Sequence, residues 1–192
     1  MACAIAGFFA DPLTRLCVYN CNTSLGYYGD TSDGRCYPRC PTGYGNPLNS
    51  QCVSQCPKTP KMFFGDSMTK TCVLSCPAER YGDPLNNLCV AALSCPSGYF
   101  GDDITGRCVA VCNRLLKLFA DPIVKKCVPV CTFPYFADPN RQACVLNCTN
   151  QLYKDNSTLT CVTTCPSMPD LYGDPNSLYC EYNCTNKWFS YS

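Results

Sequence analysis

The stretch Cys95-Pro-Ser-Gly-Tyr-Phe-Gly-Asp-Asp-Ile-Thr-Gly-Arg-Cys-Val109 contains the pattern that decides the fold. In it an aromatic residue is followed by Gly and Asp, and a cysteine comes eight residues after the aromatic residue. The same interval occurs ten times in the 192 residues, at Phe9–Cys17, Tyr28–Cys36, Tyr44–Cys52, Phe64–Cys72, Tyr81–Cys89, Phe100–Cys108, Phe119–Cys127, Phe136–Cys144, Tyr153–Cys161 and Tyr172–Cys180. The whole chain is therefore a tandem repeat.

Each repeat of roughly 18 residues begins at the cysteine that precedes its aromatic residue. Ten repeats occupy residues 3–183, with starts at Cys3, Cys21, Cys40, Cys56, Cys76, Cys95, Cys112, Cys131, Cys148 and Cys165. Residues 184–192 begin an incomplete eleventh repeat. The distance from the aromatic residue to the next cysteine is constant, whereas the distance before the aromatic residue varies. This predicts a rigid segment joined to a loop that tolerates insertions.

The rigid segment has the features of a β-hairpin. In Phe9-Ala-Asp-Pro-Leu-Thr14, Asp and Pro occupy turn positions that suit their side chains, and most repeats end in the extended pair Cys-Val. A unit of this size cannot bury a core of its own, so it must stack on its neighbours. We expect a small disulfide-rich fold, mostly irregular with short β-hairpins. Its tandem repeats would stack into an elongated, solenoid-like rod without a large hydrophobic core.

Cysteine accounts for 21 of the residues, which is typical of a disulfide scaffold in a secreted, oxidising setting. Two pairings are open. We favour joining the start of each repeat to the cysteine that ends its hairpin: Cys3–Cys17, Cys21–Cys36, Cys40–Cys52, Cys56–Cys72, Cys76–Cys89, Cys95–Cys108, Cys112–Cys127, Cys131–Cys144, Cys148–Cys161 and Cys165–Cys180. The alternative pairs neighbouring cysteines across three residues, which requires a tight turn because an extended strand separates them by about 13 Å. The favoured scheme leaves Cys184 unpaired or bonded to another molecule.

Composition excludes several classes of function. The net charge of +1 and the pI of about 7.2 argue against nucleic acid as a partner. No apolar run approaches the roughly 20 residues of a membrane span. The chain has no histidine, so Ser-His-Asp and Cys-His catalysis and mixed Cys/His zinc sites are excluded, and we expect neither an enzyme nor a cofactor. Because the repeat already begins at Cys3, we expect a mature or trimmed segment.

A recurring aspartate is the one candidate for metal binding. It follows the aromatic residue by two positions in nine repeats, as Asp11, Asp30, Asp66, Asp83, Asp102, Asp121, Asp138, Asp155 and Asp174, with Asn46 in the tenth. Stacking could align these side chains into a ladder of calcium ligands, but each also suits the start of a turn, which we favour. Basic residues before the hairpin cysteine, such as Arg15, Lys70 and Arg107, could face these aspartates across the hairpin.

Four sequons are possible attachment sites for N-linked glycans in a secreted protein. They are Asn22-Thr-Ser, Asn147-Cys-Thr, Asn156-Ser-Thr and Asn183-Cys-Thr. Where cysteine is the middle residue, disulfide formation could compete with glycosylation. Asn22 and Asn156 are therefore the strongest candidates.

Residues 95–109 resemble furin-like or growth-factor-receptor-type cysteine-rich repeats, and the long array resembles cysteine-rich extracellular surface or filament glycoproteins of ciliates and other protists. The resemblance extends from Cys3 to Cys184. It implies single-disulfide units stacked in a row and an extracellular location. The array is more uniform than in receptors, and no ligand-binding or kinase-linked domain interrupts it. A receptor function is therefore not favoured.

These features together predict an extracellular structural glycoprotein that assembles end to end with copies of itself into a filament or surface coat. The predicted subunit contacts are Phe8 and Phe9 at one end and Trp188 and Phe189 at the other. Repeat stacks with unsealed ends tend to associate. A first alternative is a binding module, either a receptor ectodomain or an adhesive surface antigen, and a second is a protease inhibitor that presents a loop between disulfides.

Overall fold

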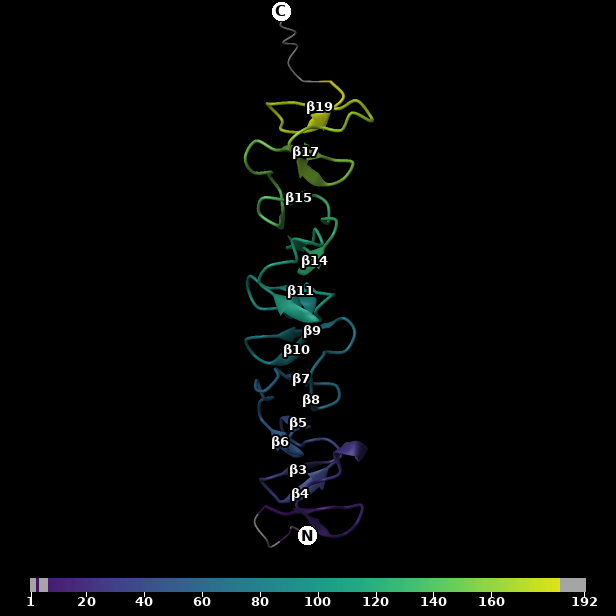
Figure 1. Cartoon of the computed structure of the whole chain (residues 1–192), viewed down its shortest axis with the longest axis vertical. Coiled ribbons are helices and arrows are strands. Elements are labelled where there is room, and N and C mark those ends of the chain that lie inside the picture. The colour runs from purple at the N-terminus through teal and green to yellow at the C-terminus, as the bar shows by residue number, and fades with distance from the viewer. Residues whose placement is uncertain (1–2, 4–6, 184–192) are drawn as a thin grey trace, which may run out of the picture. The chain divides into compact units, whose positions relative to one another are not determined.

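The computed structural model describes Cys3 and residues 7–183 of the chain. The described residues up to 96, together with 103–108, form one compact unit, and residues 97–102 and 109–183 form a second. In both units the described residues form short β-hairpins joined by loops, and their only helices are two 3-10 turns of three residues (Figure 1). The predicted disulfide-rich fold of tandem hairpins is confirmed. No helix in the described ranges has the length and hydropathy needed to cross a membrane.

The first unit contains five complete hairpins, together with Arg107 and Cys108. Its elements are β1 (Phe9–Ala10), β2 (Cys17–Val18), η1 (Thr23–Leu25), β3 (Tyr28–Asp30), β4 (Arg35–Tyr37), β5 (Tyr44–Asn46), β6 (Gln51–Val53), β7 (Phe64–Asp66), β8 (Thr71–Val73), β9 (Arg80–Asp83), β10 (Leu88–Ala91) and η2 (Ala92–Ser94). Strand β12 spans Arg107–Val109. Each first strand thus begins at the aromatic residue or next to it.

The second unit repeats the same pattern. Its strands are β11 (Phe100–Asp102), β13 (Phe119–Asp121), β14 (Lys126–Val128), β15 (Phe136–Asp138), β16 (Ala143–Val145), β17 (Tyr153–Asp155), β18 (Thr160–Val162), β19 (Tyr172–Gly173) and β20 (Cys180–Glu181). These strands have two or three residues each, too few to be stable alone. Their stability must come from the crosslinks and from the neighbouring repeats.

The hairpins within each unit are built in the same way, as the second repeat illustrates. Strands β3 and β4 are antiparallel, with Tyr28 opposite Tyr37 and Asp30 opposite Arg35. The turn closes when the Gly34 N–H donates to the Asp30 carbonyl at 2.9 Å, and Gly34 has a positive φ of 66°. A residue with positive φ occupies this position, six after the aromatic residue, in every repeat, although only Gly34 and Gly106 are glycines there.

Successive hairpins pair in parallel through one strand of each. Strand β3 lies parallel to β6, with Gly29 opposite Gln51, while β5 is antiparallel to β6. Consequently β3 and β5 run in opposite directions, and the turns of successive repeats project to opposite sides. The same relation recurs in the second unit, where β13 is parallel to β16 and β15 is antiparallel to β16.

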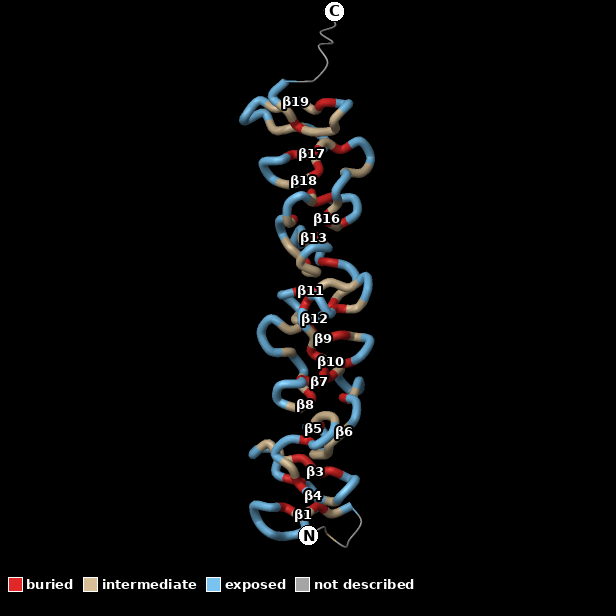
Figure 2. The backbone as a smooth tube through the Cα atoms, turned by 180° about the vertical axis from the view of Figure 1, so that it is seen from behind, coloured by how far each residue is buried: buried red, intermediate tan, exposed pale blue. Residues whose placement is uncertain are grey.

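The buried residues lie along the strands, and the loops are mostly exposed (Figure 2). The core is divided into small clusters, each formed by one or two apolar side chains and by disulfide cysteines. One such cluster joins Phe9 to Cys21 and Cys36, and another joins Cys56, Phe63 and Cys72. The absence of a single large core among the described residues agrees with the sequence-based expectation.

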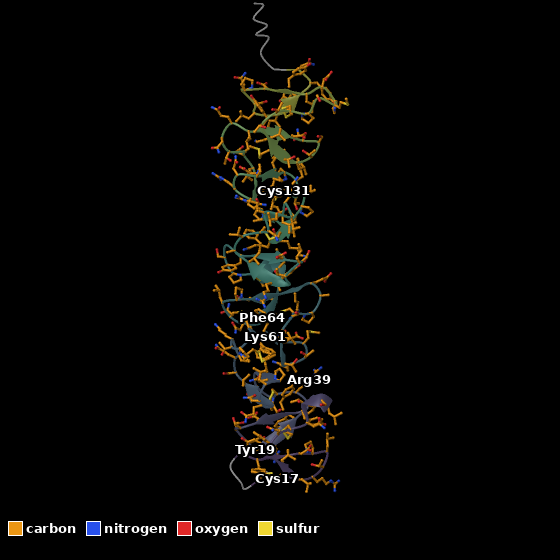
Figure 3. The ribbon with its side chains drawn as sticks, viewed as in Figure 1. Cys17, Tyr19, Arg39, Lys61, Phe64 and Cys131 are labelled. Atoms are coloured by element: carbon orange, nitrogen blue, oxygen red, sulfur yellow. A yellow bond between two sulfur atoms is a disulfide. The ribbon has the colours of Figure 1, made fainter. Side chains whose placement is uncertain are left out.

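Ten disulfides close the repeats, and yellow sulfur bonds recur along the ribbon in Figure 3. The bonded pairs are Cys3–Cys17, Cys21–Cys36, Cys40–Cys52, Cys56–Cys72, Cys76–Cys89, Cys95–Cys108, Cys112–Cys127, Cys131–Cys144, Cys148–Cys161 and Cys165–Cys180. These are the pairs of the favoured scheme. Each bond ties the start of a repeat, across its variable loop, to the second strand of its own hairpin.

Candidate functional site: the contact between repeats

A single backbone hydrogen bond recurs between consecutive repeats. The residue after the aromatic position donates its N–H to the carbonyl of the positive-φ residue in the next repeat. In the first unit the pairs are Ala10–Gly34, Gly29–Ser50, Gly45–Lys70, Gly65–Asn87 and Gly82–Gly106, and in the second unit they are Gly101–Lys125, Ala120–Gln142, Ala137–Leu159 and Lys154–Leu178, with distances of 2.7–3.2 Å. The carbonyl of the positive-φ residue therefore points toward the preceding repeat.

The aromatic ring of each repeat covers the small residue of the next one. A Cβ atom added to Gly82 would lie 2.5 Å from the Phe64 ring, and one added to Gly29 would lie 2.6 Å from the Phe9 ring. Phe64 is only 1% exposed as a result. In the second unit Phe119 packs in one cluster with Ala137. Such close approach of a ring to the next backbone explains why Gly or Ala follows the aromatic residue so often.

Cationic side chains cover several of these rings from a later repeat. The Nζ atoms of Lys70 and Lys125 lie 5.8 and 5.2 Å from the centroids of Tyr44 and Phe100, each in the repeat immediately before. Arg107 lies 5.4 Å from the centroid of Phe64, two repeats before it. Sequence reasoning considered these basic residues as partners for aspartates; the structure places them within cation–π distance of aromatic rings.

The recurring aspartates are buried at the turns and accept hydrogen bonds there. In the fourth repeat the Asp66 carboxylate accepts from the Met68 N–H at 3.0 Å and from the Thr69 hydroxyl at 2.9 Å. Asp121 and Asp138 also accept from Thr132 and Thr149, in the repeat that follows. These bonds fit the role of a turn residue. Among the described residues, no group of three or more metal-ligating side chains could hold a metal ion.

Two of these carboxylates have a shifted pKa. Burial raises the pKa of Asp138, but hydrogen bonds from the Thr149 hydroxyl and from the backbone N–H groups of Asn140 and Thr149 outweigh burial, and the net pKa lies below its ordinary value. The same balance, with donors from Ser157 and Thr158, lowers the pKa of Asp155. Both side chains are therefore ionised at neutral pH and held in place by their donors.

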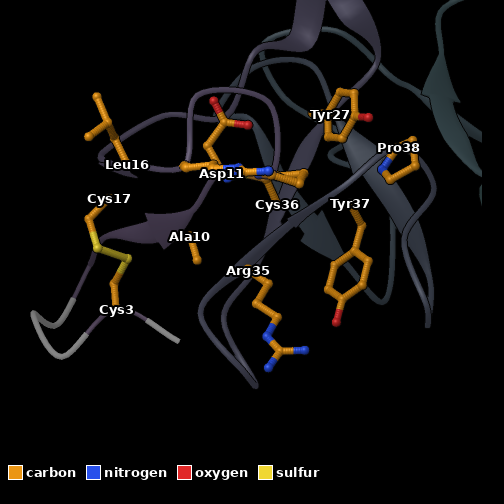
Figure 4. A pocket seen from close by; sticks show the side chains of 12 residues that line it. Cys3, Ala10, Asp11, Leu16, Cys17, Tyr27, Arg35, Cys36, Tyr37 and Pro38 are labelled. Atoms are coloured by element: carbon orange, nitrogen blue, oxygen red, sulfur yellow. A yellow bond between two sulfur atoms is a disulfide. The ribbon is translucent and has the colours of Figure 1, made fainter. Parts of the chain in front are cut away.

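Residues of the first two repeats line a pocket. Its lining includes Ala10, Arg15, Leu16 and the Cys3–Cys17 disulfide from the first repeat, and Tyr27, Arg35 and Tyr37 from the second. Figure 4 shows Ala10 between that disulfide and Arg35. Cys17 is exposed here, although the equivalent Cys36, Cys72 and Cys89 are buried.

The predicted glycosylation sites lie at the surface. Asn22, Asn147, Asn156 and Asn183 are all exposed. Asn156 lies in a hairpin turn, and Asn22 caps η1 by accepting from the Leu25 N–H at 3.3 Å. The Asn147 side chain accepts a hydrogen bond of 2.9 Å from Lys154. Solvent exposure therefore does not distinguish the four sites, but Asn156 is the one that lies in a hairpin turn.

The predicted subunit contacts are only partly within the described residues. Phe8 is half-buried and stacks edge-on against Tyr19 at 5.9 Å. Phe9 is 3% exposed because it packs against the second repeat, so its ring offers almost no surface to another copy. Cys184, Trp188 and Phe189 lie outside the described residues.

The comparisons with known proteins give one partial similarity. A stretch of 76 residues, 40% of this chain, is 38% identical to proprotein convertase subtilisin/kexin type 6 of the rat. The aligned stretch spans 8% of that protein's length. No protein-family model matches the chain, and no solved structure matches it. The similarity supports the resemblance to furin-like cysteine-rich repeats, while the resemblance to ciliate proteins stays a prediction.

Sequence reasoning missed the two features that join the repeats. One is the positive-φ carbonyl six residues after the aromatic position, for which glycine at Gly34 and Gly106 was the only signal. The other is the placement of Lys70, Lys125 and Arg107 over rings of earlier repeats. Both depend on the register between repeats, which the spacing within one repeat does not specify.

Proposed function

We propose that this protein is an extracellular structural glycoprotein that assembles end to end with copies of itself into a filament or surface coat. The observation that carries the proposal is the contact between repeats, which uses one hydrogen bond and one ring at each step. A contact that a chain makes repeatedly with itself can also be made by a second copy with the same surfaces. Such a head-to-tail contact produces open polymers unless its rotation closes a ring.

The covalent framework supports a mechanical role. Ten disulfides close loops with sequence separations of 12–16 residues, and each is worth roughly 3 kcal/mol in the chain-entropy model. A density of this kind is typical of extracellular proteins. A repeat closed by its own crosslink resists local opening, which suits a component that bears load.

The surface chemistry is compatible with association. A net charge of +1 gives little electrostatic repulsion between copies. Apolar side chains two positions after the turn Asp or Asn are about half exposed or more; these are Leu13, Leu48, Met68, Leu85, Ile104 and Ile123. Glycans on the exposed Asn22 and Asn156 would keep other parts of the surface soluble.

The proposal assigns no catalysis and no cofactor to this chain. Its chemistry would be limited to disulfide formation, N-glycosylation and contact with other copies. Nothing in the recurring site brings together a nucleophile, a base and an oxyanion donor. The partial similarity to a convertase stretch is compatible with a non-catalytic cysteine-rich segment.

Electron microscopy of the full chain, secreted from eukaryotic cells and purified without reductant, tests the proposal. We expect linear assemblies whose length grows with protein concentration. Dispersed particles of one copy at every concentration would overturn it.

Two further measurements address the covalent predictions. A Cys184→Ser variant should assemble without intermolecular disulfides, so that only the unmodified chain gives crosslinked oligomers on non-reducing gels. Mass spectrometry of glycopeptides should find glycans at Asn22 and Asn156; unmodified peptides at both positions would refute the glycoprotein prediction.

A further inference from the structure

We infer that the variable loop of the seventh repeat binds a lipid membrane whose surface carries anionic headgroups. In this contact Leu115 and Leu116 enter the membrane interface. The cationic side chains of Arg114, Lys117 and Arg141 face the headgroups. All five residues belong to the second compact unit. The inference concerns attachment to a lipid surface, and it holds whether or not copies of the chain assemble end to end.

The variable loop of the seventh repeat is held in one turn by its own groups. The Lys117 N–H donates to the Arg114 carbonyl at 3.0 Å. The Asn113 side chain accepts hydrogen bonds from the N–H groups of Leu115 and Leu116 at 3.0 and 3.4 Å. A turn that is already formed loses little conformational freedom on binding, which favours a contact made by its tip.

The two leucines of this turn project into solvent. Leu115 is 93% exposed and Leu116 is 51% exposed. Contiguous exposed apolar surface of this kind marks a site of interaction with a protein or a membrane. The variable loop of the second repeat is capped in the same way, because Asn22 accepts from the Leu25 N–H. That loop contains one leucine and no charged residue, so it provides a natural comparison.

The surface around the leucines is cationic. Residues 109–163, all of which the structure describes, contain six basic and three acidic residues. The acidic residues are the turn residues Asp121, Asp138 and Asp155. None of the three is more than 1% exposed. Arg114, Lys117 and Arg141 are all exposed, so the charge that this stretch presents to solvent is positive.

Two hydrogen bonds place the turn of the eighth repeat beside this loop. The Gln142 side chain donates to the carbonyl of Leu118, at the end of the loop. The Gln142 carbonyl accepts from the Ala120 N–H at 3.2 Å. Arg141, the neighbour of Gln142, therefore adds a third cation next to the two that flank the leucine pair.

The combination of charge and apolar surface identifies the partner as a lipid surface. Basic side chains are attracted to the negative potential of an anionic bilayer, and leucine side chains gain free energy when they leave water. Long basic side chains keep their charge at the level of the headgroups while their stems lie along the apolar region. A soluble polyanion would bind the cations but would leave both leucines in water.

Sedimentation of the full-length oxidised protein with lipid vesicles tests the inference. We expect binding to vesicles with equal parts of phosphatidylglycerol and phosphatidylcholine, and much weaker binding to phosphatidylcholine alone or at high salt. Leu115→Ser should lower the partition coefficient about tenfold or more, and Arg141→Ser should lower it about fivefold. Leu25→Ser and Lys61→Ser, exposed positions in the variable loops of the second and fourth repeats, are the matched controls and should leave it nearly unchanged.

A tryptophan at the tip distinguishes insertion from electrostatic adsorption. Leu115→Trp, combined with Trp188→Phe, should bind the mixed vesicles at least as tightly as the unmodified chain. Its emission should shift to the blue and be quenched by brominated lipid. Leu25→Trp in the same background should show neither change.

Three outcomes would overturn the inference. One is equal vesicle binding by Leu115→Ser and by the unmodified chain, and another is binding to dextran sulfate without binding to the vesicles. If Leu115→Ser were defective only in association between copies, the loop would belong to a contact with a second copy and the inference would be wrong. The proposed function is tested separately, by the length of assemblies formed without lipid.

Discussion

The two compact units make the same contact between repeats with different residues beneath the ring. In the first unit glycine takes this position at Gly29, Gly45, Gly65 and Gly82, and each lies against the ring of the preceding repeat. In the second unit the position begins with Gly101, is then held by Ala120, Ala137 and Lys154, and returns to glycine at Gly173. The hydrogen bond is 2.7 Å long at both Gly65 and Ala137. The comparison shows that the backbone register is kept while the ring accommodates different neighbours.

The largest expected effect concerns the rings themselves. Phe64→Ala in the first unit and Phe119→Ala in the second should each destabilise their unit by about 3–5 kcal/mol, the usual cost of emptying a buried aromatic site. Denaturant unfolding of the oxidised protein measures both. The exposed Phe133→Ala is the control and should change stability little. A negligible cost at Phe64 would mean that the disulfides alone hold the repeats.

The next prediction exchanges the small residues between the units. Gly82→Ala places a Cβ atom 2.5 Å from the buried Phe64 ring, so we expect a loss of about 1–3 kcal/mol from overpacking. The reverse change Ala120→Gly removes one methyl group and adds backbone freedom, at a cost of about 1 kcal/mol. Thermal unfolding of both variants compares them. Equal tolerance of both exchanges would show that the rings adjust freely and that the glycines are not required.

The sequence predicted the parts of this comparison that lie within one repeat. The fixed interval from Tyr28 to Cys36 places both residues on paired strands, and the Asp-Pro pair marks the turn, because these depend on local geometry. The same interval made the start of each repeat the favoured partner of its hairpin cysteine. Local spacing was therefore sufficient to predict the hairpin and its crosslink.

The contact between repeats could not be predicted in the same way. The pairing of Gly29 with Gln51 is set by packing across a loop of variable length, and no residue type marks it. Subunit contacts were assigned to Phe9 because it is aromatic and lies early in the chain, but its ring is covered by the second repeat. The burial of Phe9 follows from the stacking direction, which a list of aromatic residues does not contain.

Acid should lower the stability that a turn gains from a buried aspartate, and Asp138 in the second unit provides the test. The folded pKa of Asp138 lies below its ordinary value, so its contribution to stability is present above about pH 4 and is lost as the pH falls through the lowered pKa. Asp138→Asn should cost about 1 kcal/mol at pH 7, and the difference from the unmodified protein should shrink below pH 4. Unfolding by denaturant across pH 2–7 measures this.

The first unit provides the reciprocal test, because Asn46 holds the same position and accepts from the Leu48 N–H at 3.0 Å. Asn46→Asp should leave stability at pH 7 equal or slightly higher and should add a loss of stability in acid. If the Asp138 variant kept its full deficit at pH 2, the carboxylate charge would have no part in the stability of the turn.

The smallest effect is expected at Lys154, which occupies the position after the aromatic residue that Gly or Ala holds in the other repeats. Its side chain is 8% exposed, its Nζ atom lies 4.6 Å from the Tyr179 centroid and 5.8 Å from that of Phe136, and it donates to Asn147. The cost of burying the ammonium offsets much of this attraction. Lys154→Ala, which restores the residue found at Ala137, should therefore change stability by less than about 1 kcal/mol. Lys154→Met keeps the length without the charge and isolates the cation–π contribution. A loss of more than about 2 kcal/mol in the free energy of unfolding of both variants would mean that the charge stabilises the contact between the eighth and ninth repeats. An electrostatic contact would then hold, at this position of the second unit, the place of the close ring contact in the first.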